Sequence, residues 1–256
     1  MAQIELNDVC LRYFTINEET EALRNVNLSV DEGEFISIVG PSGCGKSTLL
    51  SLVSGVIKPT EGEVTLFGEK LKETSDRIGY MLQNDHLFEW RNVLNNLLVG
   101  AEIRGINRKE AKERALDLLN RYGMGDFAHH SPKQLSGGMR QRVALIRTLV
   151  IQPEILLLDE PFSALDYQTR LTLSDEISTI LREQKKTVVL VTHDISEAIA
   201  MADRVIVMSK RPSFVKRDYK ISFAGGRPSP FYTRQAPEYN DYFNEIWKEL
   251  EEHVHA

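Results

Sequence analysis

A glycine-rich segment at residues 40–48 places the strongest constraint on how this chain can fold. It follows an apolar run at residues 35–39, expected to be a buried strand, and precedes a helical pattern that begins at residue 48 and ends near Gly55. A strand, a loop of this composition and a helix together form a phosphate-binding loop. Its glycines let successive backbone N–H groups turn toward an anion, and the helix N-terminus adds its positive dipole end. We therefore expect the chain to bind a nucleoside triphosphate.

The loop offers both backbone and side-chain groups to a nucleotide. Lys46 is expected to reach the β- and γ-phosphates, and the Ser47 hydroxyl to ligate Mg²⁺. Tyr13, at the end of a predicted strand, is a candidate for stacking on adenine, and Phe14 is the competing candidate. A cross-strand role is the other interpretation of Tyr13, because strands are enriched in aromatic residues. The residues expected to contact ATP within the loop are Gly40, Ser42, Gly43, Cys44, Gly45, Lys46, Ser47 and Thr48.

Apolar residues alternate with polar ones along the first 30 residues, as they do in half-buried antiparallel strands. The pattern predicts short strands around residues 4–6, 9–13 and 26–30, with a polar break at residues 17–21 before the third. Alternating strands and helices later in the chain predict a parallel α/β sheet. The strands expected in this second half cover residues 155–158, 188–192 and 205–208, with one helix over residues 169–183 and a last helix from near residue 237 to beyond residue 250. Further strands are expected at residues 63–67 and 77–82.

Helical spacing dominates the middle of the chain, with predicted helices over residues 92–100 and 107–122. The fold class is therefore α/β: a P-loop NTPase core of the RecA-like type, with an N-terminal antiparallel β subdomain and an inserted α-helical subdomain. We expect one domain over residues 1–256. The core would comprise residues 1–85 and 153–256, the helical subdomain residues 86–152, and the tail with the last helix residues 213–256.

Composition excludes several classes of protein. The net charge of −6 argues against a general nucleic-acid-binding surface. The two cysteines, Cys10 and Cys44, lack metal-ligand spacing and a disulfide framework, which favours a reducing compartment. No N-terminal signal peptide is visible, and no stretch approaches the roughly 18–20 apolar residues of a spanning helix. If the function of this chain involves a membrane, we expect a different chain to span that membrane.

Two acidic residues end the apolar run at residues 155–158. Asp159 is expected to hold the Mg²⁺ shell, because Mg²⁺ takes one or two carboxylates together with phosphates and waters. Glu160 could accept a proton from an attacking water. The other interpretation is a solvated strand tip, which the phosphate loop in the same chain disfavours.

A second glycine-rich anion site is predicted at residues 135–141. Ser136, Gly137 and Gly138 stand where a helix begins, which offers N–H groups, a small hydroxyl and a helix dipole. One triphosphate does not need two such sites from one chain. A γ-phosphate held between two copies of the protein would use both, so a homodimer is expected.

These motifs together resemble the ATP-binding subunit of ATP-binding-cassette (ABC) transporters over nearly the whole chain. Residues 40–48 match Walker A, residues 155–160 Walker B, residues 135–141 the family signature and residues 163–166 the D-loop. The resemblance implies that Gln83 is the Q-loop glutamine, His193 the switch histidine and Tyr13 the adenine-stacking aromatic.

The resemblance also implies the roles of these residues. Lys46, Glu160, His193 and Gln83 would be catalytic, with Glu160 polarising the attacking water and His193 contacting the γ-phosphate. Mg²⁺ would be held by Ser47, Gln83 and Asp159. The residues implied to contact the ATP of the other protomer are Ser136, Gly137, Gly138 and Gln141, with Asp166 in the D-loop.

A finer resemblance points to importers of nitrate, sulfonates, taurine and related solutes such as thiamine-precursor pyrimidines. It rests on residues 138–142, on residues 209–212 and on the short aromatic C-terminal tail, without the long C-terminal β-domain of sugar-importer ATPases. It implies transmembrane permease partners, an indirect solute-binding partner outside the cytoplasm, and a peripheral location on the cytoplasmic face of the membrane. Residues 86–91 would face the permease; an ordinary loop with a buried Trp90 is the alternative.

Two other classes of function stay open at this point. A soluble member of the superfamily could act on ribosomes or in DNA repair, although such proteins usually carry two cassettes or a long coiled-coil insertion. A P-loop kinase could phosphorylate a small metabolite, but a kinase needs an acceptor pocket rather than a second glycine-rich anion site. Phosphate release without an added acceptor separates the kinase from the ATPase.

Overall fold

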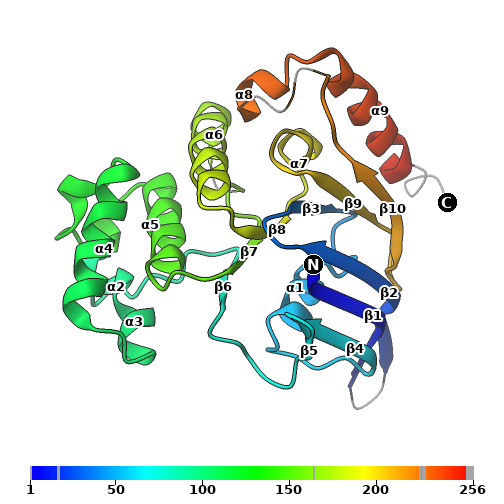
Figure 1. Ribbon diagram of the computed structural model, residues 1–256, viewed down its shortest axis with the longest axis horizontal. Helices are drawn as coiled ribbons and strands as arrows, with labels where there is room; N and C mark the ends of the chain where they lie inside the picture. Colours follow the sequence, from blue (N-terminus) through cyan, green and yellow to red (C-terminus); the bar gives the residue numbers. More distant parts are fainter. Residues whose placement is uncertain (1, 16–17, 164, 225, 227–228, 252–256) are drawn as a thin grey trace. The chain divides into compact units, whose positions relative to one another are not determined.

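The computed structural model describes residues 2–15, 18–163, 165–224, 226 and 229–251 (Figure 1). The chain forms two compact units. Unit 1 comprises Met1–Ser75 and Leu171–Ala256, and unit 2 comprises Asp76–Arg170. The helical block predicted at residues 86–152 lies inside unit 2, which also carries a pair of parallel strands. The mixed α/β architecture, with its antiparallel sheet and its parallel strands, confirms the predicted fold class.

Unit 1 contains an antiparallel sheet with strand order β2-β1-β4-β5. Its strands are β1 (Ala2–Phe14), β2 (Glu19–Asp31), β4 (Glu61–Leu66) and β5 (Glu69–Lys70). The strands predicted at residues 4–6 and 9–13 are one continuous strand, bent where its register on β2 shifts between Leu6 and Val9. Asp8 lies at this bulge with φ at 49°. The predicted polar break includes residues 16–17, which lie outside the described residues.

The second sheet of unit 1 supplies the parallel strands around the phosphate loop. Its order is β10-β9-β3-β8, formed by β3 (Phe35–Val39), β8 (Thr187–Val191), β9 (Arg204–Met208) and β10 (Val215–Lys220). β3 pairs in parallel with β8 and β9, and β10 pairs antiparallel with β9. Every residue of β3 and β8 is buried, as expected of central parallel strands.

Five helices accompany these sheets in the described part of the chain. They are α1 (Lys46–Val53), α6 (Tyr167–Glu183), α7 (Ile195–Met201), α8 (Pro230–Thr233) and α9 (Pro237–Glu251); the first turn of α6 crosses the boundary between the units. α7 packs on β3, and α9, red in Figure 1, packs on α7 and β9. Within the described residues, no helix has the length and apolar character needed to cross a membrane.

Unit 2 is built around α5 (Gly137–Val150), which contacts α2 (Val93–Leu97), α3 (Val99–Ile103), α4 (Arg108–Arg121) and the strand β6 (Ile78–Met81). β6 pairs in parallel with β7 (Ile155–Asp159). The 3-10 helices η1 (Gly125–Phe127) and η2 (Pro132–Gln134) lie between α4 and α5. The predicted helix at residues 92–100 is instead two short helices joined at Leu98. Trp90 is 79% exposed, so the interpretation of a buried Trp90 is wrong.

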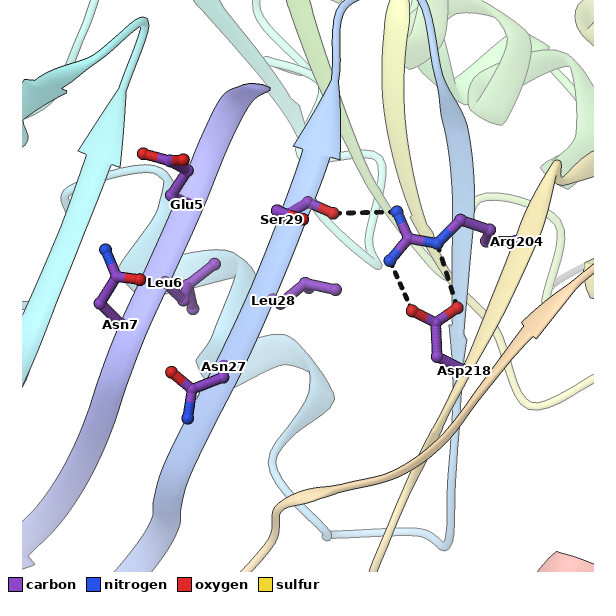
Figure 2. Close-up of a pocket in the computed structure, with 8 residues that line it drawn as sticks. All are labelled: Glu5, Leu6, Asn7, Asn27, Leu28, Ser29, Arg204 and Asp218. Carbon is purple, nitrogen blue, oxygen red and sulfur yellow. Dashed lines mark hydrogen bonds and ion pairs between the residues drawn. The ribbon is translucent and has the colours of Figure 1, made fainter. Parts of the chain in front are cut away.

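Arg204 ties the two sheets of unit 1 together at the start of β9. Its guanidinium donates two hydrogen bonds to Asp218 on β10, at 3.0 and 2.6 Å, and one to the carbonyl of Ser29 on β2, at 2.9 Å (Figure 2). It also pairs with Glu34 at 3.0 Å. The hydrogen bonds that Arg204 donates to Asp218 raise the pKa of Arg204 above its ordinary value. Arg204, Asp218 and Ser29 border a polar pocket of about 320 Å³, whose other lining residues are Glu5, Leu6, Asn7, Asn27 and Leu28.

Replacing this guanidinium is expected to destabilise unit 1. Arg204→Met keeps most of the side-chain volume but leaves Glu34 and Asp218 without their shared cation, at a cost of about 2 kcal/mol in the free energy of unfolding. Urea unfolding measures this loss. The matched control is Lys70→Gln, which removes a pair with Glu63 whose side chains are 62% and 44% exposed. The control should stay within about 0.5 kcal/mol of the parent. Equal losses in both variants would contradict the role given to Arg204.

A second ion-pair cluster holds α9 on β10. Lys216 contacts the Glu249 carboxylate at 2.7 Å, and Arg217 contacts it at 3.0 Å. The Lys216 ammonium also donates to the Glu249 carbonyl at 2.9 Å. The hydrogen bond from Lys216 is the main cause that lowers the pKa of Glu249 below 4.5. Trp247 lies on the same helix and is 47% exposed, so we expect its fluorescence to respond when α9 undocks.

The docking of α9 should therefore weaken at acid pH. A carboxyl whose pKa is lower in the folded state stabilises the fold above its unfolded pKa of 4.5, and the contribution disappears as pH falls through the folded pKa. Glu249→Gln should destabilise α9 at pH 7 but not at the acid end of the titration. Trp247 fluorescence in a Trp90→Phe background measures the unfolding of α9 at each pH. A stability difference that does not change with pH would contradict this assignment.

Candidate functional site

The phosphate loop and His193 lie at the same edge of the parallel sheet in unit 1. β3 and β8 pair in parallel with Ile38 opposite Val191, so their carboxyl ends are adjacent. The phosphate loop follows the end of β3, and the Thr192 N–H donates to the Ile38 carbonyl at 3.2 Å. His193 is the next residue, and its side chain is exposed. Parallel pairing thus brings together two predicted site residues that are far apart in the sequence, Lys46 and His193.

The phosphate loop is a tight turn closed by its own lysine. The Cys44 N–H donates to the Pro41 carbonyl at 3.2 Å. The Lys46 ammonium donates to the carbonyls of Gly40 and Pro41, at 2.9 and 3.1 Å, and is only 7% exposed. Gly45 has φ at 119°, and a Cβ there would lie 3.1 Å from Leu23. A residue with a side chain would strain the loop at this position.

The start of α1 fits a phosphate group. Gly45 occupies the N-cap position, and within the described residues no side chain caps the helix and no acidic residue lies in its first turn. The first N–H groups of a helix need acceptors that the helix itself does not provide. With the buried Lys46 cation beside them, these N–H groups form a site whose chemistry suits the β- and γ-phosphates of a nucleotide.

Tyr13 reaches the phosphate loop, whereas Phe14 does not share its face of β1. The Tyr13 hydroxyl lies 3.4 Å from the Thr48 hydroxyl, and the ring is 44% exposed. Phe14 is 68% exposed, and successive side chains of a strand point to opposite faces. The geometry favours Tyr13 over Phe14 as the adenine-stacking residue, and this role stays a prediction.

Unit 2 carries the acidic half of the predicted site. β6 and β7 pair in parallel with Met81 opposite Leu158, so the loops that follow them are adjacent. There the Gln83 amide donates to the Glu160 carboxylate at 3.1 Å. Asp159, at the end of β7, is 4% exposed. Glu160 follows with φ at 46°, a sparsely populated conformation that turns the chain sharply after the strand.

Ser136 caps the signature helix α5. Its hydroxyl accepts a hydrogen bond from the Met139 N–H at 3.3 Å, while Gly137 and Gly138 form the first turn. This contact uses a lone pair of the hydroxyl, so its proton can still be donated to another acceptor. A Cβ at Gly138 would lie 2.9 Å from Cδ2 of Leu165, so a larger residue there would have to displace that side chain. Gln141 is 4% exposed, and its buried amide oxygen has no partner among the described residues.

The D-loop precedes α6 and ends in a capping aspartate. The Asp166 carboxylate accepts from the Thr169 N–H at 3.0 Å, and hydrogen bonds from Thr169 are the main cause that lowers the pKa of Asp166. Asp166 is exposed. Ala164, part of the predicted D-loop, lies outside the described residues.

Sequence reasoning missed a connection between the Gln83 loop and α5. Arg147 donates to the carbonyls of Asp85 and His86, at 2.7 and 2.8 Å, and Arg140 bonds the Asp85 carboxylate at 3.0 Å. Burial lowers the pKa of Arg147. The sequence offered one signal: Arg140 and Arg147 are seven residues apart on α5. This spacing places both on one face of the helix.

Together, the phosphate loop, the capped signature helix and the acidic end of β7 define a P-loop nucleotide-binding protein. The ABC transporter family matches residues 23–163, and the chain belongs to that family. It is similar to the uncharacterized ABC transporter ATP-binding protein YtlC of Bacillus subtilis, with 46% identity over 98% of this chain and 96% of the relative.

Two relatives have named solutes. The taurine import ATP-binding protein TauB of Ruegeria pomeroyi is 37% identical over 88% of this chain and 84% of its own length. The nitrate import ATP-binding protein NrtD of Synechocystis is 35% identical over 95% of this chain and 93% of its own length. The solved structure of the ATP-binding cassette MJ0796, a dimer in a post-hydrolysis state bound to ADP and Pi, matches with a TM-score of 0.77 and 38% sequence identity. The match covers 85% of this chain and 98% of the MJ0796 chain. This chain is an ABC ATP-binding subunit, and it is an ATPase.

The observed cap of Ser136 and its predicted nucleotide contact can be separated by substitution. Aspartate is a good N-cap, so Ser136→Asp should leave the free energy of unfolding within about 0.5 kcal/mol of the parent. Its carboxylate has no proton to donate and repels phosphate oxygens, so ATP turnover should fall roughly tenfold or more. Phosphate release and urea unfolding measure the two effects.

Ser136→Ala is the matched variant for the cap. It should lose about 1 kcal/mol of stability, because α5 loses its side-chain cap. If Ser136→Asp hydrolysed ATP at the parent rate, the predicted contact between Ser136 and the nucleotide would be wrong.

Proposed function

We propose that this chain is the ATP-hydrolysing subunit of an importer for a small solute, and that it couples ATP-driven dimer closure to movement of membrane-spanning partners. The observation that carries the proposal is the hydrogen bond from Gln83 to Glu160. It fixes the half-buried Glu160 carboxylate directly after the buried Asp159, as would suit a base that activates water. A polarised water and a held triphosphate are what hydrolysis requires.

The chain's own residues supply positioning and charge stabilisation. Lys46 and the loop N–H groups would hold the β- and γ-phosphates, and Tyr13 would stack on adenine. Glu160 would accept the proton of the attacking water, with its carboxylate oriented by Gln83. Ser47, Gln83 and Asp159 would hold Mg²⁺; all three offer oxygen ligands, which suit this ion. When bound, Mg²⁺ neutralises charge on the phosphates.

A homodimer would complete the site. Ser136, Gly137 and Gly138 would contact the ATP of the partner subunit, as would the predicted but buried Gln141. His193 would contact the γ-phosphate, and Asp166 would lie at the dimer contact. The dimeric state of the MJ0796 cassette supports this arrangement, as do the exposed Ser136 and Asp166 side chains.

The relatives that import taurine and nitrate support a small sulfonate or oxyanion as the transported solute, with related solutes such as thiamine-precursor pyrimidines in the same class. A permease would then be the direct partner on the cytoplasmic face of the membrane, and a solute-binding protein an indirect one. The exposed Trp90, whose ring lies 4.9 Å from that of Phe88, supports contact between residues 86–91 and the permease.

Glu160→Gln is the sharpest test of hydrolysis. Removing a general base should lower turnover by roughly 10²-fold or more while ATP still binds, so ATP-loaded dimers accumulate. Phosphate release without an added acceptor and size-exclusion chromatography with Mg·ATP measure the two results. The matched control is Glu154→Gln, which removes a half-exposed carboxylate paired with Arg77. Parent-level turnover in Glu160→Gln would show that Glu160 is not the base.

The importer assignment has its own test. The chain is co-expressed with importer permease subunits from the same organism, and the complex is reconstituted in liposomes with a solute-binding protein. Taurine or nitrate should stimulate ATP hydrolysis. The solute should accumulate on the side of the membrane opposite the solute-binding protein. Hydrolysis that needs a metabolite acceptor would indicate a kinase, and failure to bind any permease would indicate a soluble factor.

A further inference from the structure

The segment at residues 209–212 has no role in the site described above, yet the structure places it beside the phosphate loop. It follows β9, the strand next to β3, and hydrogen bonds hold it rigidly. The Ser213 hydroxyl donates to the Ser209 carbonyl at 3.0 Å, and the Ser209 hydroxyl accepts from the Phe214 N–H at 3.0 Å. Ser209 is 3% exposed and Ser213 is fully buried. This segment therefore presents Arg211 from a fixed backbone.

Arg211 contacts the phosphate loop directly. Its guanidinium donates to the Gly43 carbonyl at 2.8 Å. Gly43 has φ at 71°, in the left-handed region. The other polar group of the same peptide unit, the Cys44 N–H, donates to the Pro41 carbonyl. Both ends of this peptide unit are thus bonded, which fixes its orientation at the tip of the loop.

A pocket of about 360 Å³ lies on this side of the loop. Lys210 and Arg211 line it together with the loop itself, so two cations stand beside the backbone that receives a polyanion. Both side chains are exposed, so solvent and salt screen their long-range effect. Only Arg211 is hydrogen-bonded to Gly43. The loop residues that line the pocket are Pro41, Ser42, Gly43 and Cys44.

We propose that Arg211 is a positioning residue for the phosphate loop. By holding the Gly43 carbonyl, it keeps the loop in one conformation before ATP arrives, so less conformational freedom is lost on binding. A guanidinium is suited to this task because its planar fork of donors is pre-organised. The contribution is made equally to bound ATP and to the transition state, so it appears in affinity rather than in the chemical step. The proposal rests on the ATPase activity of the chain and adds a determinant of its ATP affinity.

The test compares Arg211→Gln with Lys210→Gln, which removes the same charge from the same pocket. Both are measured as full-length protein, for ATP affinity by fluorescent-nucleotide binding and for kcat and KM by phosphate release. Arg211→Gln should raise Kd and KM for ATP about fivefold to tenfold with kcat unchanged, as expected for the loss of one charge-assisted hydrogen bond. Lys210→Gln should change Kd less than about twofold.

Salt separates the hydrogen bond from the charge. At 0.5 M salt the effect of Arg211→Gln should persist, because a direct contact is screened less than a distant charge. Arg211→Lys, which keeps the charge and one donor, should recover part of the affinity. Equal weakening by both glutamine variants that vanishes in salt would overturn the proposal.

The other outcomes are equally decisive. An unchanged Kd in Arg211→Gln, or a fall in kcat with constant KM, would also overturn the proposal. If Arg211→Gln does not fold, as judged by circular dichroism, the lysine variant decides. A Kd for Arg211→Lys between the parent value and a tenfold increase supports the proposal, and a parent-level Kd overturns it. Loss of hydrolysis in Glu160→Gln with this affinity pattern intact shows that the two assignments stand independently.

Discussion

Parallel strand pairing is the constraint on which both halves of the site depend. In unit 1, the pairing of β3 with β8 places the phosphate loop and His193 at one sheet edge. In unit 2, the pairing of β6 with β7 does the same for Gln83 and Glu160. Each pair of loops follows strands whose residues are almost all buried, and buried strands cannot slip in register without exposing apolar side chains. Apolar strands that carry little chemistry of their own thus position the predicted site residues of each half.

The sequence predicted most completely the features that are local. The phosphate loop, the helix that follows it and the capped start of α5 each lie within about a dozen consecutive residues, so composition and spacing specify them. The last helix was also predicted, because its aromatic residues recur at helical spacing and stack as Tyr239, Phe243 and Trp247 along one side of α9.

The misses share a physical cause. β10 has the polar sequence of a partly exposed edge strand, and its stability comes from pairing with β9 and from the contact of Lys216 with Glu249, which no local pattern reveals. The bulge at Asp8 joins two apparent strands, because the alternation changes phase while the backbone continues. Contacts such as Arg211 with Gly43 join residues 168 positions apart and depend on sheet order. The roles of Lys46, Asp159 and Glu160 followed from local motifs. Those of Gln83, His193, Gln141 and Asp166 came from resemblance to a family.

The phosphate loop shows why cations belong on both of its sides. A loop that binds a polyanion must present N–H groups, yet every peptide unit also carries a carbonyl whose partial negative charge would repel phosphate. Lys46 covers the carbonyls of Gly40 and Pro41, and Arg211 covers that of Gly43. Among the described residues, no carboxylate pairs with the buried Lys46 ammonium; backbone carbonyl dipoles solvate it instead and leave its positive charge uncompensated. A carboxylate in that position would have stabilised Lys46 more strongly, but it would also have cancelled the charge that attracts ATP.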